Sequence, residues 1–205
     1  MISRLLLTTL LTCSVALAAC GGGSGGDSTT AVSATTTASA LEKDAKGLDA
    51  GMAKDAVGAV GICGPLAQMR LLESTVRRFD AATERLQVST LGFPDGAGRS
   101  LAAFTQRQRT ESEDCDVYLA EDAAQVTALA ADGGLYDLAP ALKDWKAQAG
   151  SPAIAPVLVG DRAFGLPIRS GRASGVLVAA VHGRNAGGAL EVIRELSGAQ
   201  RTEAP

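Results

Sequence analysis

The chain has 205 residues, with 19 Lys or Arg, 22 Asp or Glu and a net charge of −3 near neutral pH. This small acidic excess argues against the basic surface that nucleic-acid binding requires, so we expect no nucleic-acid partner. With one Trp, two Tyr and four Phe in the whole chain, the core must be built mainly from Ala, Leu and Val.

The first 19 residues have the pattern of a secretory signal. Arg4 precedes an apolar stretch at residues 5–17, which is shorter than the roughly 20 residues of a membrane-spanning helix. The sequence Leu17-Ala18-Ala19-Cys20 resembles the lipobox of bacterial lipoprotein precursors. This resemblance implies that Cys20 carries lipid and anchors the chain to the extracytoplasmic face of the cell membrane. The alternative is an ordinary signal peptide with a chance cysteine.

Residues 20–40 are rich in Gly, Ser, Thr and Ala and contain a single charge. Such a segment cannot bury enough apolar surface to offset its chain entropy, so we expect a flexible tether behind the lipidated cysteine. Residues 41–205 then remain for one domain with a sizeable core.

Helical and strand patterns alternate in the first part of this domain. A weak helix interrupted by two glycines is predicted at 41–55, before the more regular elements. These are strands at 56–65, 85–93 and 116–120, each followed by a helix, with helical periodicity from Met69 to Phe79, near 99–112, and from Val126 to Ala130. Asp122 is placed to cap the third of these helices, and Gly133-Gly134 ends it.

The later part is less regular. Gly160-Asp161 lies between two apolar runs and predicts a hairpin, residues 175–181 predict a buried strand, and Ala189, Val192, Ile193 and Leu196 predict a final helix. The whole pattern indicates an α/β fold with a mostly parallel sheet flanked by helices on both faces.

Motifs for catalysis and cofactors are weak. Glycines 58, 61 and 64 do not have the spacing of a dinucleotide-binding loop, so we expect no cofactor, and no cysteine belongs to a metal-ligand cluster. The single histidine, His182, has no acidic or cysteine partner nearby in sequence. We therefore expect a protein that is not an enzyme, and a hydrolase that uses Asp122 and His182 is kept as a minor hypothesis.

Several segments together resemble one family. "ICGP", "VRRFDAAT", "AAFTQRQRTESEDCDV", "CDVYLAEDAAQVTALAADGGLYDLAP" and "VGDRAFGLPIRS" occur in the order found in extracellular solute-binding lipoproteins of carbohydrate ABC importers (family 1-like). The resemblance covers residues 61–170. It implies a single periplasmic-binding-protein-like lobe, a small-molecule solute of the sugar type, and ABC permease subunits as partners.

The same resemblance implies a ligand set at the ends of strands, namely Asp122, Gln125, Arg169 and Ser170. It also favours a disulfide between Cys63 and Cys115, although the predicted strands place one cysteine at a strand end and the other at a strand start, which argues against a bridge. The sequence alone is therefore consistent with bridged and with free cysteines at these two positions.

Two departures from the family bear on function. Members have two lobes, whereas "SGVLVAAVHGRNAGGALEVIRELSGAQR", which resembles their final segment, follows the hairpin almost directly. Gln125 and Gly134 also replace aromatic residues that grip sugars in the family. We therefore keep two hypotheses: a solute-binding lipoprotein of an ABC importer, and a shortened relative without a solute that serves as an interaction or structural lipoprotein.

Overall fold

The computed structural model describes residues 46–96, 98–147, 153–169 and 171–201. The predicted signal peptide, the tether with Cys20, and Ser170 lie outside the described residues. No helix among the described residues has the length and apolar composition that crossing a membrane requires.

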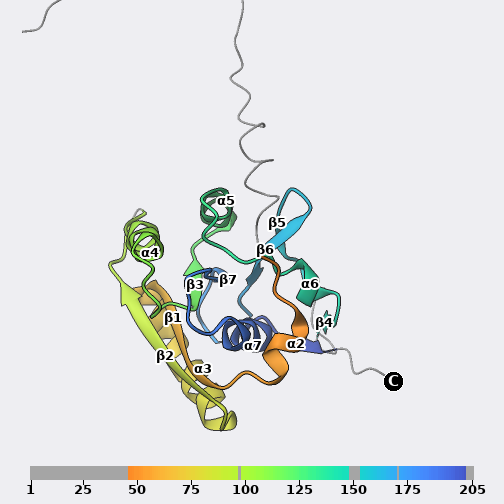
Figure 1. Cartoon of the computed structure of the whole chain (residues 1–205). Coiled ribbons are helices and arrows are strands. Elements are labelled where there is room, and N and C mark those ends of the chain that lie inside the picture. The colour runs from red at the N-terminus through yellow and green to blue at the C-terminus, as the bar shows by residue number, and fades with distance from the viewer. Residues whose placement is uncertain (1–45, 97, 148–152, 170, 202–205) are drawn as a thin grey trace, which may run out of the picture. The chain divides into compact units, whose positions relative to one another are not determined.

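A six-stranded sheet with the strand order β2-β1-β3-β7-β6-β5 forms the centre of the described chain (Figure 1). Its strands are β1 (Gly58–Pro65), β2 (Leu86–Phe93), β3 (Val117–Ala120), β5 (Val157–Val159), β6 (Arg162–Pro167) and β7 (Val176–Ala179). β1 runs parallel to β2 and β3, whereas the pairs β3/β7, β7/β6 and β6/β5 are antiparallel. Four strands (β1, β2, β3 and β6) thus share one direction, and β7 and β5 run the opposite way.

Helices cover both faces of this sheet. They are α2 (Ala50–Lys54), α3 (Leu66–Ala82), α4 (Arg99–Arg109), α5 (Ala123–Ala131), α6 (Ala139–Leu142) and α7 (Ala186–Leu196). Side chains of β3 alternate between the faces: Val117 and Leu119 pack with α2, α3 and α7, while Tyr118 and Ala120 pack with α4 and α5. Figure 1 shows α4 and α5 on one side of the sheet and α3 and α7 on the other. The predicted α/β lobe with a mostly parallel sheet and flanking helices is therefore confirmed.

The sequence prediction of a helix at 41–55 was wrong in length. Within the described residues the helix is only α2, which begins after Asp49, whose carboxylate accepts a hydrogen bond from the Gly51 N–H. Residues 46–49 are not helical, and Gly47 forms an isolated bridge with Asp137. Three short elements were not predicted: α6, and the two-stranded sheet of β4 (Trp145–Ala147) and β8 (Ala199–Arg201).

The structure joins Cys63 and Cys115 in a disulfide, with their Cα atoms 5.7 Å apart. The structure thus answers the question that the sequence left open: β3 begins beside the second half of β1, where Ile62 pairs with Val117, and this brings the two cysteines within bridging distance. The chain before β3 also crosses very close to Gly61, where a Cβ atom would lie 2.1 Å from the Asp114 carbonyl oxygen. A glycine at this position thus lets the two cysteines approach each other.

Candidate functional site

The edge where β3 ends carries two of the predicted ligand residues. Asp122 follows β3 and begins α5, where its carboxylate accepts a 2.9 Å hydrogen bond from the Gln125 N–H. The predicted helix cap is thus confirmed. Asp122 is exposed and Gln125 is half-buried, so both can be reached from solvent at the carboxyl end of a strand, where α/β sheets bind ligands.

The Gln125 side chain is already engaged by its neighbours. Its amide nitrogen donates to the Glu121 carboxylate at 2.6 Å, and its amide oxygen accepts from the Glu121 N–H at 3.0 Å. The Tyr118 hydroxyl donates to the same oxygen at 3.5 Å and lies 3.2 Å from the Ser100 hydroxyl. Burial raises the pKa of Tyr118 to about 12, so this hydroxyl stays protonated at neutral pH. A ligand that recruits Gln125 has to replace some of these bonds.

Arg169 lies beyond the end of β6, which runs in the same direction as β3. Its guanidinium donates to the Ala153 carbonyl oxygen at 2.9 Å, and its backbone N–H donates to the Leu196 carbonyl oxygen at the end of α7. Ser170, the fourth predicted ligand residue, lies outside the described residues. The fold therefore brings Asp122 and Gln125 together, whereas Arg169 bonds to the carbonyl oxygens of Ala153 and Leu196.

His182 lies at the opposite edge of the sheet from Asp122. β7 runs antiparallel to β3, with Ala120 opposite Val176 and Val117 opposite Ala179, so the end of β7 lies beside the start of β3. Roughly 10 Å of strand separates the two edges. Asp122 and His182 therefore lie at opposite ends of β3, which contradicts the minor hypothesis of a hydrolase that uses both residues.

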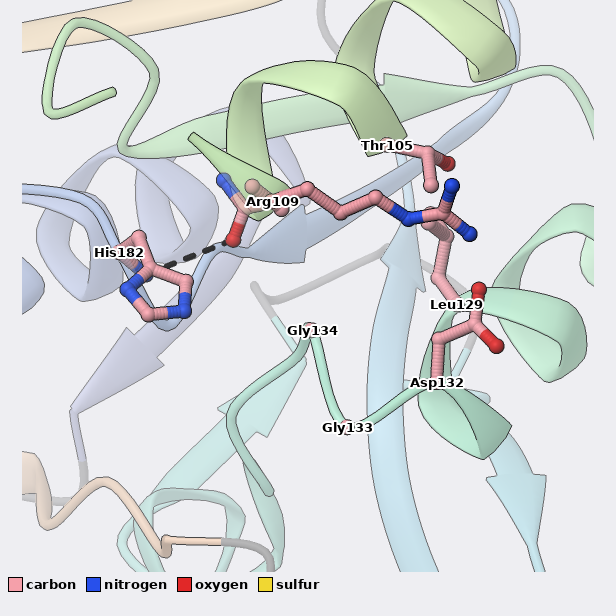
Figure 2. A pocket seen from close by; sticks show the side chains of 8 residues that line it. Thr105, Arg109, Leu129, Asp132, Gly133, Gly134 and His182 are labelled. Carbon is pink, nitrogen blue, oxygen red and sulfur yellow. Dashed lines mark hydrogen bonds between the residues drawn. The ribbon is translucent and has the colours of Figure 1, made fainter. Parts of the chain in front are cut away.

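A pocket of about 290 Å³ lies at this second edge (Figure 2). It is lined by the ends of α4 and α5, the turn after α5 and the turn after β7: Thr105, Gln108, Arg109, Leu129, Asp132, Gly133, Gly134 and His182. Figure 2 shows the Arg109 side chain extending across the pocket above the Gly133-Gly134 turn, with its guanidinium on the side of Asp132 and with His182 on the other side. Sequence reasoning missed this site, because only an antiparallel β7 brings His182 to the ends of α4 and α5.

Neither edge resembles a metal centre: among the described residues, no group of three or more His, Cys, Asp or Glu side chains is placed to hold a metal ion. The chemistry available at both edges is hydrogen bonding and charge recognition. At the β3 edge the polar groups are already bonded within the chain, whereas at the pocket several are not.

Comparison with protein-family models finds no match, and comparison with curated protein sequences finds none either. Solved structures give matches of low similarity. One is a sugar transporter protein from Rhizobium etli in an open conformation, with a TM-score of 0.44 and 17% identity, covering 54% of this chain and 28% of that chain. Another is the galacto-N-biose/lacto-N-biose I-binding protein of an ABC transporter from Bifidobacterium longum, with a TM-score of 0.43, 21% identity and coverage of 56% and 29%. The matched part spans less than a third of either solved chain.

Proposed function

We propose that this chain is a solute-binding lipoprotein of a carbohydrate ABC importer, held at the extracytoplasmic face of the membrane through Cys20. The observation that carries the proposal is the position of Asp122 and Gln125, which follow β3 at the edge where the carboxyl ends of β1 and β3 meet. Carboxylate and amide groups at such an edge suit the hydroxyl groups of a sugar. The resemblance of the sequence to solute-binding lipoproteins implies the same two residues as ligands.

A second function is favoured by the contacts within the chain. Gln125 is bonded to Glu121 and Tyr118, and Arg169 donates to the Ala153 carbonyl oxygen. Two of the proposed ligand residues therefore serve the fold itself. In an interaction or structural lipoprotein without a solute, Gln125 and Arg169 only stabilise the fold. A binding experiment must distinguish this alternative from the solute-binding function.

The test is thermal unfolding of the purified protein with a panel of mono- and oligosaccharides. A sugar that binds the folded protein and is present at a hundred times its dissociation constant increases the free energy of unfolding by about 2.7 kcal/mol. This increase raises the melting temperature by several degrees. The matched variant is Asp122→Asn, because Asn caps a helix about as well as Asp while removing the charge. We expect one sugar to stabilise the wild type and to bind the variant at least tenfold more weakly. A melting temperature that no sugar changes favours the interaction role.

Anchoring has its own test in bacterial cells that process lipoproteins. We expect the wild type in the membrane fraction with incorporated fatty acid, and a Cys20→Ala variant without that label. A wild-type chain that is exported but carries no lipid contradicts the anchor and supports an ordinary signal peptide.

A further inference from the structure

The pocket between α4, α5 and His182 differs from the β3 edge in one respect: most of its polar side chains make no bond within the described chain. Within the described part of the chain, the side chains of Thr105, Arg109, Asp132 and His182 make no hydrogen bond or ion pair. Gln108 is only 7% exposed, and its amide nitrogen is buried without a hydrogen-bond partner. Buried polar atoms are rarely left in this state, because each costs about 1–3 kcal/mol.

The orientation of the Gln108 amide is determined by its neighbour. Its oxygen accepts a hydrogen bond from the His182 backbone N–H at 3.4 Å, so the nitrogen is the atom left over. Exchanging the two atoms would place one donor against another. The wall of the pocket therefore contains one buried, unused donor, and Arg109, Thr105 and the His182 ring supply further donors.

The donors outnumber the acceptors in this pocket. A guanidinium presents several N–H groups in a plane and matches a carboxylate in two parallel hydrogen bonds. Asp132 is the one carboxylate among the lining residues, and it suits a hydroxyl or ammonium group. The volume of about 290 Å³ lies at the small end of ligand pockets, and Leu129 gives it an apolar floor with only 2% of that side chain exposed.

We propose that this pocket binds a small organic carboxylate that carries a hydroxyl or ammonium group near the carboxylate, as sugar acids and amino acids do. Arg109 holds the carboxylate, and Asp132 accepts from the neighbouring donor. The backbone of Gly133 and Gly134 leaves the pocket open on that side, because neither residue carries a side chain. This site is separate from Asp122 and Gln125 and goes beyond the proposed solute site.

His182 makes the test direct, because it is the single histidine of the chain and its ring signals in an NMR spectrum need no assignment. The purified protein is titrated with galacturonate and with serine, which stand for the two ligand sources. Galactose, which lacks the carboxylate, and acetate, which lacks the second donor, are the control compounds. We expect galacturonate or serine to shift the His182 ring signals in a saturable way, and the control compounds to leave them unchanged.

Variants connect that signal to the pocket. Arg109→Gln is expected to weaken the binding at least tenfold and Asp132→Asn several-fold. The matched control is Arg99→Gln, an exposed arginine of the same helix that does not line the pocket. Asp122→Asn must leave this binding unchanged, which separates it from the proposed sugar site. The proposal is overturned if neither galacturonate nor serine shifts the His182 signals, or if Arg109→Gln binds as tightly as the wild type.

Discussion

The carboxylate of Asp116 accepts a 2.7 Å hydrogen bond from the backbone N–H of Asn185, which lies 69 residues further along the chain. Its second oxygen accepts from the Gly61 N–H, also at 2.7 Å. Asn185 in turn caps α7 by accepting from the Gly188 N–H at 2.8 Å. One fully buried side chain thus links β1, the start of β3 and the start of α7.

We expect Asp116→Ala to lower the free energy of unfolding by about 2–5 kcal/mol, because it leaves the buried Gly61 N–H and the partly buried Asn185 N–H without an acceptor. Urea unfolding followed by circular dichroism measures this loss. Asp116→Asn keeps one acceptor oxygen and is expected to lose less. If Asp116→Ala is as stable as the wild type, the link between β1 and α7 does not depend on this carboxylate.

Asp116 also predicts a dependence of stability on pH. Burial raises the pKa of Asp116 above its ordinary value of 3.8, against the opposing effects of the hydrogen bonds from Gly61 and Asn185 and the charge of Arg184. The folded state therefore binds this proton more tightly than the unfolded state does. The contribution of Asp116 to stability is fully present at low pH and is lost as pH rises from about 4 through the raised pKa.

The measurement is the free energy of unfolding of the wild type minus that of Asp116→Asn, from about pH 3 to pH 7. Because Asn does not titrate, the difference isolates this group from the other carboxylates. We expect the difference to decrease as the pH rises. A difference that increases with pH contradicts the raised pKa.

The disulfide closes a long loop, since Cys63 and Cys115 are 52 residues apart in sequence. Replacing both with Ala is expected to lower the free energy of unfolding by about 2–5 kcal/mol, because the unfolded chain gains freedom when the loop is opened. Urea unfolding of the oxidised wild type and the double variant measures the change. Equal stability of the two proteins would show that the bridge does not constrain the unfolded chain.

The long elements of the fold were predictable because their patterns are local. The periodicity of Met69, Leu72 and Val76 places α3, and those residues are buried as expected. Asp122 was recognised as a cap from its position between a strand and an apolar stripe. In each case a stretch of fewer than twenty residues contains the whole signal.

The direction of β7 was not predictable in this way. Residues 176–179 are apolar on both faces, which is equally consistent with a parallel and an antiparallel strand. The direction follows from pairing with β3 on one side and β6 on the other, and these contacts are far apart in sequence. The pocket was missed for the same reason, because His182 meets Gln108 and Gly134 only when β7 runs antiparallel to β3.

Gly61 lies against the backbone of Asp114, in the segment that precedes β3. We expect Gly61→Ala to destabilise the fold by several kcal/mol, because the added methyl group would lie 2.1 Å from the backbone oxygen of Asp114. The matched control is Gly134→Ala, whose methyl group would lie at ordinary distances of 3.7 Å or more from its neighbours. Thermal unfolding compares the two variants, and equal melting temperatures would contradict the tight packing at Gly61.

The cap at Asp122 is separable from any role in binding. Asp122→Ala is expected to lower the free energy of unfolding by about 1 kcal/mol, because the Gln125 N–H loses its acceptor, whereas Asp122→Asn keeps the stability of the wild type. Thermal unfolding without any ligand gives both values. A large loss in the Asn variant would mean that the charge, and not the cap, stabilises the start of α5.

β2 is an edge strand, and the Val88 N–H, which would otherwise be open to another strand, donates to the Asp80 carboxylate of α3 at 2.7 Å. β2 itself, Leu86–Phe93, has no charged residue or proline to discourage edge-to-edge pairing. Asp80→Ala removes both the acceptor and the charge, so we expect association that increases with protein concentration, while Glu84→Ala, a nearby exposed control, behaves as the wild type. Sedimentation velocity measures this, and an Asp80→Ala protein that stays monomeric at the highest concentration would show that Asp80 does not protect the edge.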